Sequence, residues 1–147
     1  MIYKDSRLKS ANWKFLKALK EKSRIPNAIL FHGSDGIGKQ SIAIEFAAYI
    51  NCQGESKDSA CGHCLSCSKI KSNNYEYIDY IFPLPKGKIT SKKDTIAKSF
   101  TEKTLSEYNY ELKEKLINPF HEISITGANT ILINSVREIK KKLYRAT

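Results

Sequence analysis

Residues 25–41 read Ile25-Pro26-Asn27-Ala28-Ile29-Leu30-Phe31-His32-Gly33-Ser34-Asp35-Gly36-Ile37-Gly38-Lys39-Gln40-Ser41. The apolar run at residues 28–31 is short and is followed by a glycine at position 33, which is typical of a buried parallel strand. Beyond the glycines, the spacing of apolar residues up to about Asn51 predicts a helix. A strand, a glycine-rich loop and a helix in this order indicate an α/β domain.

The loop at residues 33–41 matches the phosphate-loop pattern except at one position, because Gln40 stands where Ser or Thr is required. Inward-pointing backbone N–H groups and the following helix N-terminus would cradle phosphates, and Lys39 would reach the terminal ones. Gln40 lacks the hydroxyl that binds Mg²⁺, and Ser41 comes one residue late. The alternative is a plain strand-to-helix turn with a solvated lysine. We expect weak ATP or ADP binding without hydrolysis, through Gly33, Ser34, Asp35, Gly36, Ile37, Gly38, Lys39, Gln40 and Ser41.

All four cysteines fall within sixteen positions, in the spacing Cys-x8-Cys-x2-Cys-x2-Cys. Four clustered thiolates suit structural Zn²⁺, and a closed sulfur shell leaves no open position for a substrate water. An iron–sulfur cluster and a redox dithiol pair are the alternatives, but the eight-residue first spacer fits no cluster pattern. His63 is then not needed as a ligand. The predicted zinc ligands are Cys52, Cys61, Cys64 and Cys67.

The charge of the chain, +10, is concentrated at its two ends. Residues 1–24 hold eight Lys or Arg against two acids, and residues 137–145 hold five against one. This balance indicates either an anionic partner or ordinary solvated helix faces. No apolar run is long enough to cross a membrane, and the N-terminus lacks the features of a signal peptide, so we expect a cytoplasmic protein without membrane contact.

The order of these motifs resembles the bacterial clamp-loader subunits of DNA polymerase III, the delta-prime and gamma/tau family of AAA+ proteins. The resemblance rests on residues 25–33, the phosphate loop, the cysteine module, and a helix predicted over residues 12–22 with Trp13 on its apolar face. It continues to about Phe82. It implies an α/β three-layer P-loop NTPase fold of the AAA+ RecA-like type, with a parallel sheet that contains residues 28–32 and 77–82.

The same resemblance implies a domain organisation. Residues 1–147 would be the N-terminal part of an AAA+ ATPase-like domain, with the zinc module at about 52–67 and an insertion at about 86–128 that forms one or two exposed amphipathic helices. Residues 131–143 would be a short strand and a helix with a capping box at Ser135 and Glu138. The Walker B, sensor and collar regions would lie downstream, which predicts that the chain is a fragment.

Gln40 favours delta-prime within the family, because gamma/tau subunits keep a Ser or Thr at this position. The implied function is sliding-clamp loading in DNA replication, with the gamma/tau and delta subunits as partners and with the clamp and primed DNA reached through the complex. A gamma/tau-type ATPase and a free-standing zinc nucleic-acid-binding module are the alternatives. In the insertion, Tyr108 and Tyr110 accompany eight cations and five acids over residues 86–116, which favours ordinary helix-surface charge over a DNA site.

Overall fold

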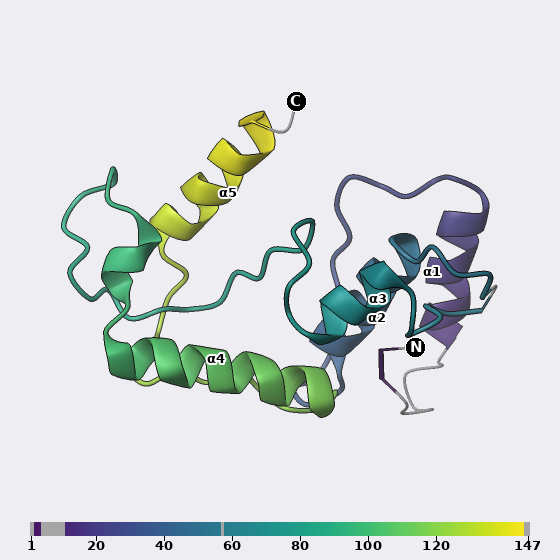
Figure 1. Cartoon of the computed structure of the whole chain (residues 1–147), viewed down its shortest axis with the longest axis horizontal. Coiled ribbons are helices and arrows are strands. Elements are labelled where there is room, and N and C mark those ends of the chain that lie inside the picture. Colours follow the sequence, from purple (N-terminus) through teal and green to yellow (C-terminus); the bar gives the residue numbers. More distant parts are fainter. Residues whose placement is uncertain (1, 4–10, 57, 146–147) are drawn as a thin grey trace. The chain divides into compact units, whose positions relative to one another are not determined.

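The structure is a computed structural model that describes residues 2–3, 11–56 and 58–145. It divides into two compact units, one formed by Met1–Ile78 with Lys113–Glu122 and the other by Asp79–Leu112 with Ile123–Thr147. Three of the eight basic residues of the N-terminal charge cluster, Lys4, Arg7 and Lys9, lie outside the described residues. The helices, shown in Figure 1, are α1 (Ala11–Glu21), α2 (Lys39–Ile50), α3 (Leu65–Lys71), the 3-10 helix η2 (Ile96–Ser99), α4 (Glu102–Ile117) and α5 (Ile133–Arg145).

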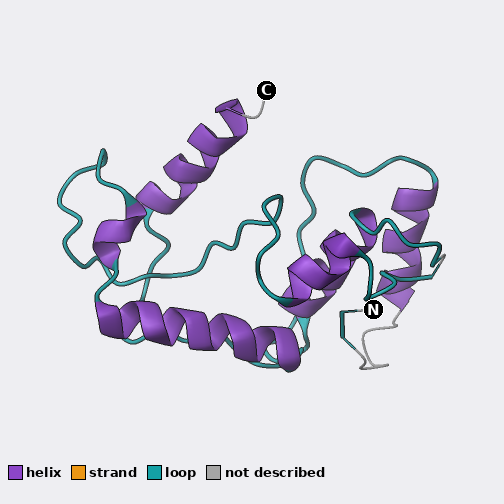
Figure 2. Cartoon of the chain, in the orientation of Figure 1, coloured by secondary structure: helices purple, strands orange, loops and turns teal. Residues whose placement is uncertain are grey.

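The predicted three-layer α/β fold is wrong. Figure 2 shows only helices and loops over the described ranges, with no strand at residues 28–32 or 77–82. A strand needs a neighbouring backbone to complete its hydrogen bonds, and neither segment has one. Two of the apolar residues in this run are packed against the core of the first unit without forming a strand. Ile29 and Phe31 pack on that core, whereas Leu30 between them is 89% exposed.

The first unit is built around the contact between α1 and α2. Trp13 and Leu16 of α1 pack against Phe46 and Tyr49 of α2, and the rings of Trp13 and Phe46 meet edge to edge with centroids 6.5 Å apart. The predicted helices at residues 12–22 and up to about Asn51 are confirmed within a residue or two at these ends. Helical periodicity succeeded here because the apolar faces that produce it are buried against each other.

A carboxylate lies inside this unit, on the buried side of α2. Glu45 is fully buried, and its Oε2 accepts hydrogen bonds from the backbone N–H groups of Ile2, at 2.8 Å, and Tyr3, at 3.0 Å. Burial raises the pKa of the Glu45 carboxyl, against the effect of these two N–H donors. Its Oε1 has no hydrogen-bond partner among the described residues. Glu45 therefore ties residues 2–3 to α2, with one oxygen left unsatisfied.

The second unit contains η2, most of α4, and α5. Asn134 at the start of α5 donates to the carbonyls of Ser91, at 3.1 Å, and Asp94, at 2.8 Å. Glu138 accepts a hydrogen bond of 2.6 Å from the backbone N–H of Ile96. The predicted capping box is wrong, because α5 begins two residues before Ser135 and Glu138 is engaged by η2. Residues 86–128, which were predicted to form one or two helices, contain η2 and α4.

Candidate metal centre and phosphate-binding loop

The four cysteine side chains come together between the end of α2 and the start of α3. Their sulfur atoms all lie within 4.8 Å of one another. Cys52 and Cys64 are 4.0 Å apart at Sγ, and Cys61 and Cys67 are 3.9 Å apart. A tetrahedral site with Zn–S bonds of ~2.3 Å has sulfur–sulfur edges of about 3.8 Å. The thiol positions therefore fit a tetrahedral S₄ metal site.

Backbone N–H groups are directed at these sulfur atoms. The N–H of Cys61 lies 3.2 Å from the sulfur of Cys52, and the N–H of Cys64 lies 3.3 Å from the sulfur of Cys61. The N–H of Cys67 is the main cause that lowers the pKa of Cys64 to about 6. Burial raises the pKa of Cys67 to about 12. A cation bound by the four sulfurs would displace the protons that these thiols carry.

Contacts with the rest of the first unit position the cysteine module (residues 52–67). Trp13 in α1 donates from its indole nitrogen to the carbonyl of Asp58, at 3.0 Å, and Lys17 forms an ion pair with the Asp58 carboxylate. Gly54 is required by space, because a Cβ at this residue would lie 2.7 Å from the sulfur of Cys61. His63 is exposed and lies outside the sulfur cluster.

The loop that the sequence predicts to bind phosphate (residues 33–41), named the phosphate-binding loop after this prediction, leads directly into α2. Gly36 and Gly38 have positive φ angles of 72° and 85°, which favour glycine, and Gly38 is the N-cap of the helix. Lys39 folds back onto the loop, and its Nζ donates to the carbonyls of Gly33, at 2.8 Å, and Ser34, at 2.7 Å. The lysine therefore binds the loop's own backbone in this structure.

The two residues after the lysine have different surroundings. Gln40 is exposed, whereas Ser41 is fully buried and its hydroxyl donates to the carbonyl of Pro119. Lys115 donates to the same carbonyl at 3.0 Å and to the carbonyl of His121 at 2.6 Å. Burial lowers the pKa of the Lys115 ammonium. The Ser41 hydroxyl is thus buried and engaged with a backbone carbonyl of the protein.

Sequence reasoning missed α3 and the polar contacts of Glu45 and Lys115. The Cys64-x-x-Cys67 spacing was a usable signal for α3, because residues three apart share a helix face. Glu45 lies between Ile44 and Phe46, and a charged residue within an apolar stretch was a weak signal that this carboxylate could be buried. No local signal pointed to the pairing of Ser41 with Pro119, which is 78 residues away.

The chain is similar to proteins of bacterial DNA replication. The family model described as DNA polymerase III, delta subunit, matches residues 8–144. The DNA polymerase III subunit tau/gamma of Haemophilus influenzae is 27% identical over 110 residues, which are 75% of this chain and 15% of that protein. The DNA polymerase III subunit tau of Escherichia coli is 32% identical over 73 residues, which are 50% of this chain and 11% of that protein.

A plant protein shows a shorter match. Protein STICHEL-like 4 of Arabidopsis thaliana is 35% identical over 63 residues, which are 43% of this chain and 6% of that protein. The chain thus spans less than a sixth of the length of each of these relatives. No solved structure matches it. None of the described helices is long and apolar enough to cross a membrane.

Proposed function

The chain belongs to the DNA polymerase III delta subunit family, and from this premise we propose that it is part of a clamp-loader subunit of the delta-prime type, which assembles with other loader subunits but does not itself hydrolyse ATP. Its partners would be the gamma/tau and delta subunits, with the sliding clamp and primed DNA reached through the complex. Residues 1–147 would be the N-terminal part of that subunit, with about 86–128 as an insertion.

The surroundings of the phosphate-binding loop carry the proposal that hydrolysis is absent. Phosphoryl transfer needs a magnesium ion that neutralises the developing charge, and a hydroxyl after the loop lysine normally binds it. Here Gln40 occupies that position, and the nearby Ser41 hydroxyl is buried on the Pro119 carbonyl. Backbone N–H groups of residues 33–41 could still hold ADP or ATP weakly once Lys39 leaves the carbonyls it now binds.

The cysteine module would hold a structural Zn²⁺ through Cys52, Cys61, Cys64 and Cys67. The sulfur separations of 3.9 and 4.0 Å support zinc as the ion. Four sulfur ligands leave no open position for a substrate water, which supports a structural role. The ion would fix the loop between α2 and α3, and through Asp58 it would steady the contact of that loop with α1.

The matches to tau and tau/gamma subunits favour one second candidate, a hydrolysing gamma/tau-type subunit that tolerates Gln40. Replacing Lys39 by Ala in the full-length subunit separates the two candidates. In a reconstituted loader we expect clamp loading and total ATPase activity within about twofold of the unmodified complex, because a subunit that serves only as a rigid part of the assembly needs no nucleotide turnover.

The matched control is the same lysine substitution in a neighbouring gamma/tau subunit, which should lower both activities by orders of magnitude. A comparable fall with Lys39→Ala in this subunit would support the hydrolysing candidate. Failure of the full-length subunit to join any loader complex would contradict both candidates and leave the free-standing zinc module.

A further inference from the structure

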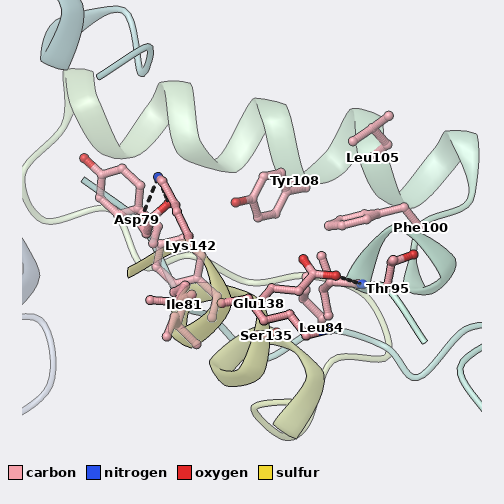
Figure 3. A pocket seen from close by; sticks show the side chains of 15 residues that line it. Asp79, Ile81, Leu84, Thr95, Phe100, Leu105, Tyr108, Ser135, Glu138 and Lys142 are labelled. Atoms are coloured by element: carbon pink, nitrogen blue, oxygen red, sulfur yellow. Dashed lines mark hydrogen bonds and ion pairs between the residues drawn. The ribbon is translucent and has the colours of Figure 1, made fainter. Parts of the chain in front are cut away.

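The second unit contains a cavity of about 640 Å³ that neither the cysteine module nor the phosphate-binding loop explains. Figure 3 shows Phe100, Leu105 and Tyr108 on one side of it and Ile81, Leu84 and Glu138 on the other. The volume lies within the range of about 300–1,000 Å³ that is usual for small-molecule sites. All of the lining residues belong to the second unit.

Aromatic rings dominate the walls of this cavity. Tyr80 and Phe82 are stacked at an interplanar angle of 10°, with ring centroids 5.9 Å apart. Tyr108 meets Phe82 at 6.5 Å and Phe100 at 5.3 Å, both edge to face. Four linked rings offer π faces to a flat ligand, and stacking of a base on an aromatic side chain is worth about 1–3 kcal/mol.

Polar groups occur among these rings. Ser135 lines the cavity, and its buried hydroxyl has no hydrogen-bond partner among the described residues. Glu138 also lines it, with Oε1 used by the N–H of Ile96. A heteroaromatic ring with N–H donors can donate a hydrogen bond to the Glu138 carboxylate, which an aliphatic or phenyl group cannot do.

Four charged residues line the cavity beside the rings, the carboxylates of Asp79 and Glu138 and the ammonium groups of Lys141 and Lys142. Lys141 and Lys142 of α5 line the cavity, and Arg137 and Lys140 belong to the same helix. Lys142 forms an ion pair with Asp79 at 2.8 Å, while its side chain remains 49% exposed. The eight cations and five acids of residues 86–116 do not include the basic residues of α5. The fold places α5 in the same unit as Tyr108. Aromatic faces next to lysines are the combination that binds nucleobases and their phosphates.

We propose that this cavity binds a nucleobase, with the attached phosphate at Lys141 and Lys142. The base would contact the face of Tyr108 and donate a hydrogen bond to the Glu138 carboxylate. The ligand is either a free nucleotide or one residue of a single-stranded nucleic acid, because both present the same base and phosphate. The site is separate from the phosphate-binding loop, so its test does not depend on the proposed function.

The test is a binding titration of the whole chain carrying Lys39→Ala, so that the phosphate-binding loop adds little to the signal. The probes are the four deoxyribonucleoside monophosphates, used singly, and a short oligothymidylate. We expect Tyr108→Leu to weaken binding roughly tenfold, because leucine keeps the apolar volume but removes the π face. Tyr108→Phe keeps the ring and should bind within about twofold of the parent chain.

The matched control is Tyr110→Leu, on the same helix but 59% exposed and outside the cavity lining, which should leave affinity unchanged. Lys141→Ala, at an exposed position of α5 that lines the cavity, should weaken binding severalfold, and it tests the proposal even if the tyrosine variants do not fold. Monophosphate binding that depends on Tyr108 assigns a free nucleotide, and binding of the oligonucleotide alone assigns a single strand. No binding of any probe, or equal losses from Tyr108→Leu and Tyr110→Leu, overturns the proposal.

Discussion

The two loops at the ends of α2 carry chemically active side chains and use them in opposite ways. At the N-terminal end, Lys39 and Ser41 are bound to main-chain carbonyls of the protein itself. At the C-terminal end, Cys52 belongs to a set of four sulfurs that lie within 4.8 Å of one another and therefore converge on one point. A motif is ready to bind a ligand only where its side chains converge on one point, and by this standard the two loops differ.

The largest effect should come from breaking the sulfur set. Replacing Cys64 with Ser removes one thiolate from the proposed four, and zinc binding of this kind contributes on the order of 10 kcal/mol of folding free energy to its module. We expect the chain to lose its single equivalent of zinc, measured by elemental analysis of protein purified under reducing conditions. Amide hydrogen exchange at residues 52–67 should rise at the same time.

The matched control is His63→Ala, which changes an exposed residue of the same loop that lies outside the cluster. It should retain one zinc per chain. Iron in place of zinc, or a metal content near zero in the unmodified chain, would refute the zinc assignment and with it one side of the comparison between the loops.

A moderate effect is expected at Glu45, in the part of α2 between the two loops. Glu45→Ala removes the acceptor of two backbone N–H groups and should lower the free energy of unfolding by about 1–3 kcal/mol. Glu45→Gln keeps an acceptor without a charge. If the cysteine module is held by its own ligands, both variants should retain full zinc content.

The pH dependence of Glu45→Gln has a definite sign. Burial raises the pKa of the Glu45 carboxyl in the folded chain above its value in the unfolded chain, about 4.3. The resulting contribution to stability is fully present below the unfolded-state pKa of this carboxyl and is lost as pH rises through its folded-state pKa. The stability of Glu45→Gln relative to the unmodified chain should therefore increase as pH rises through this range. Urea unfolding at a series of pH values measures it, and no relative change would contradict the role given to burial.

Local patterns predicted more of this molecule than non-local ones did. Trp13 and Leu16 were assigned to one helix face because helical periodicity depends on residues three and four apart, and α1 confirms them. The spacing of the cysteines likewise predicted that their side chains would meet. The predicted strand at residues 28–32 failed because pairing depends on a distant backbone that the apolar pattern of Ile29 and Phe31 does not encode.

The same reasoning explains what was missed in the phosphate-binding loop and in the second unit. The glycine pattern located the turn and its positive φ angles, but the partner of Ser41 lies 78 residues away. The cavity around Tyr108 combines residues from three separate segments. The sequence does not show that the lysines of α5 and the ring of Tyr108 belong to one site. The consequences of long-range contacts could not be read from either pattern.

The smallest effect should come from restoring a magnesium ligand to the phosphate-binding loop. We expect the unmodified chain to bind ADP weakly, with an affinity nearly independent of Mg²⁺, because Gln40 offers no hydroxyl. Gln40→Ser places a hydroxyl after Lys39, at an exposed position not committed to the interior. It should raise ADP affinity up to about tenfold with Mg²⁺ present and have little effect after chelation, as calorimetry can measure.

Gln40→Ala is the matched control, because it shortens the same side chain without adding a hydroxyl, and its ADP affinity should not depend on Mg²⁺. Tight, chelator-sensitive binding by the unmodified chain would show that another group holds the metal, and would favour the gamma/tau-type candidate. If the ADP affinity of Gln40→Ser depends on Mg²⁺ and that of the unmodified chain does not, then the side chain at position 40 alone determines whether this loop binds the metal. The loop backbone would then still be competent for phosphate, and the missing hydroxyl alone would separate it from a metal-dependent site.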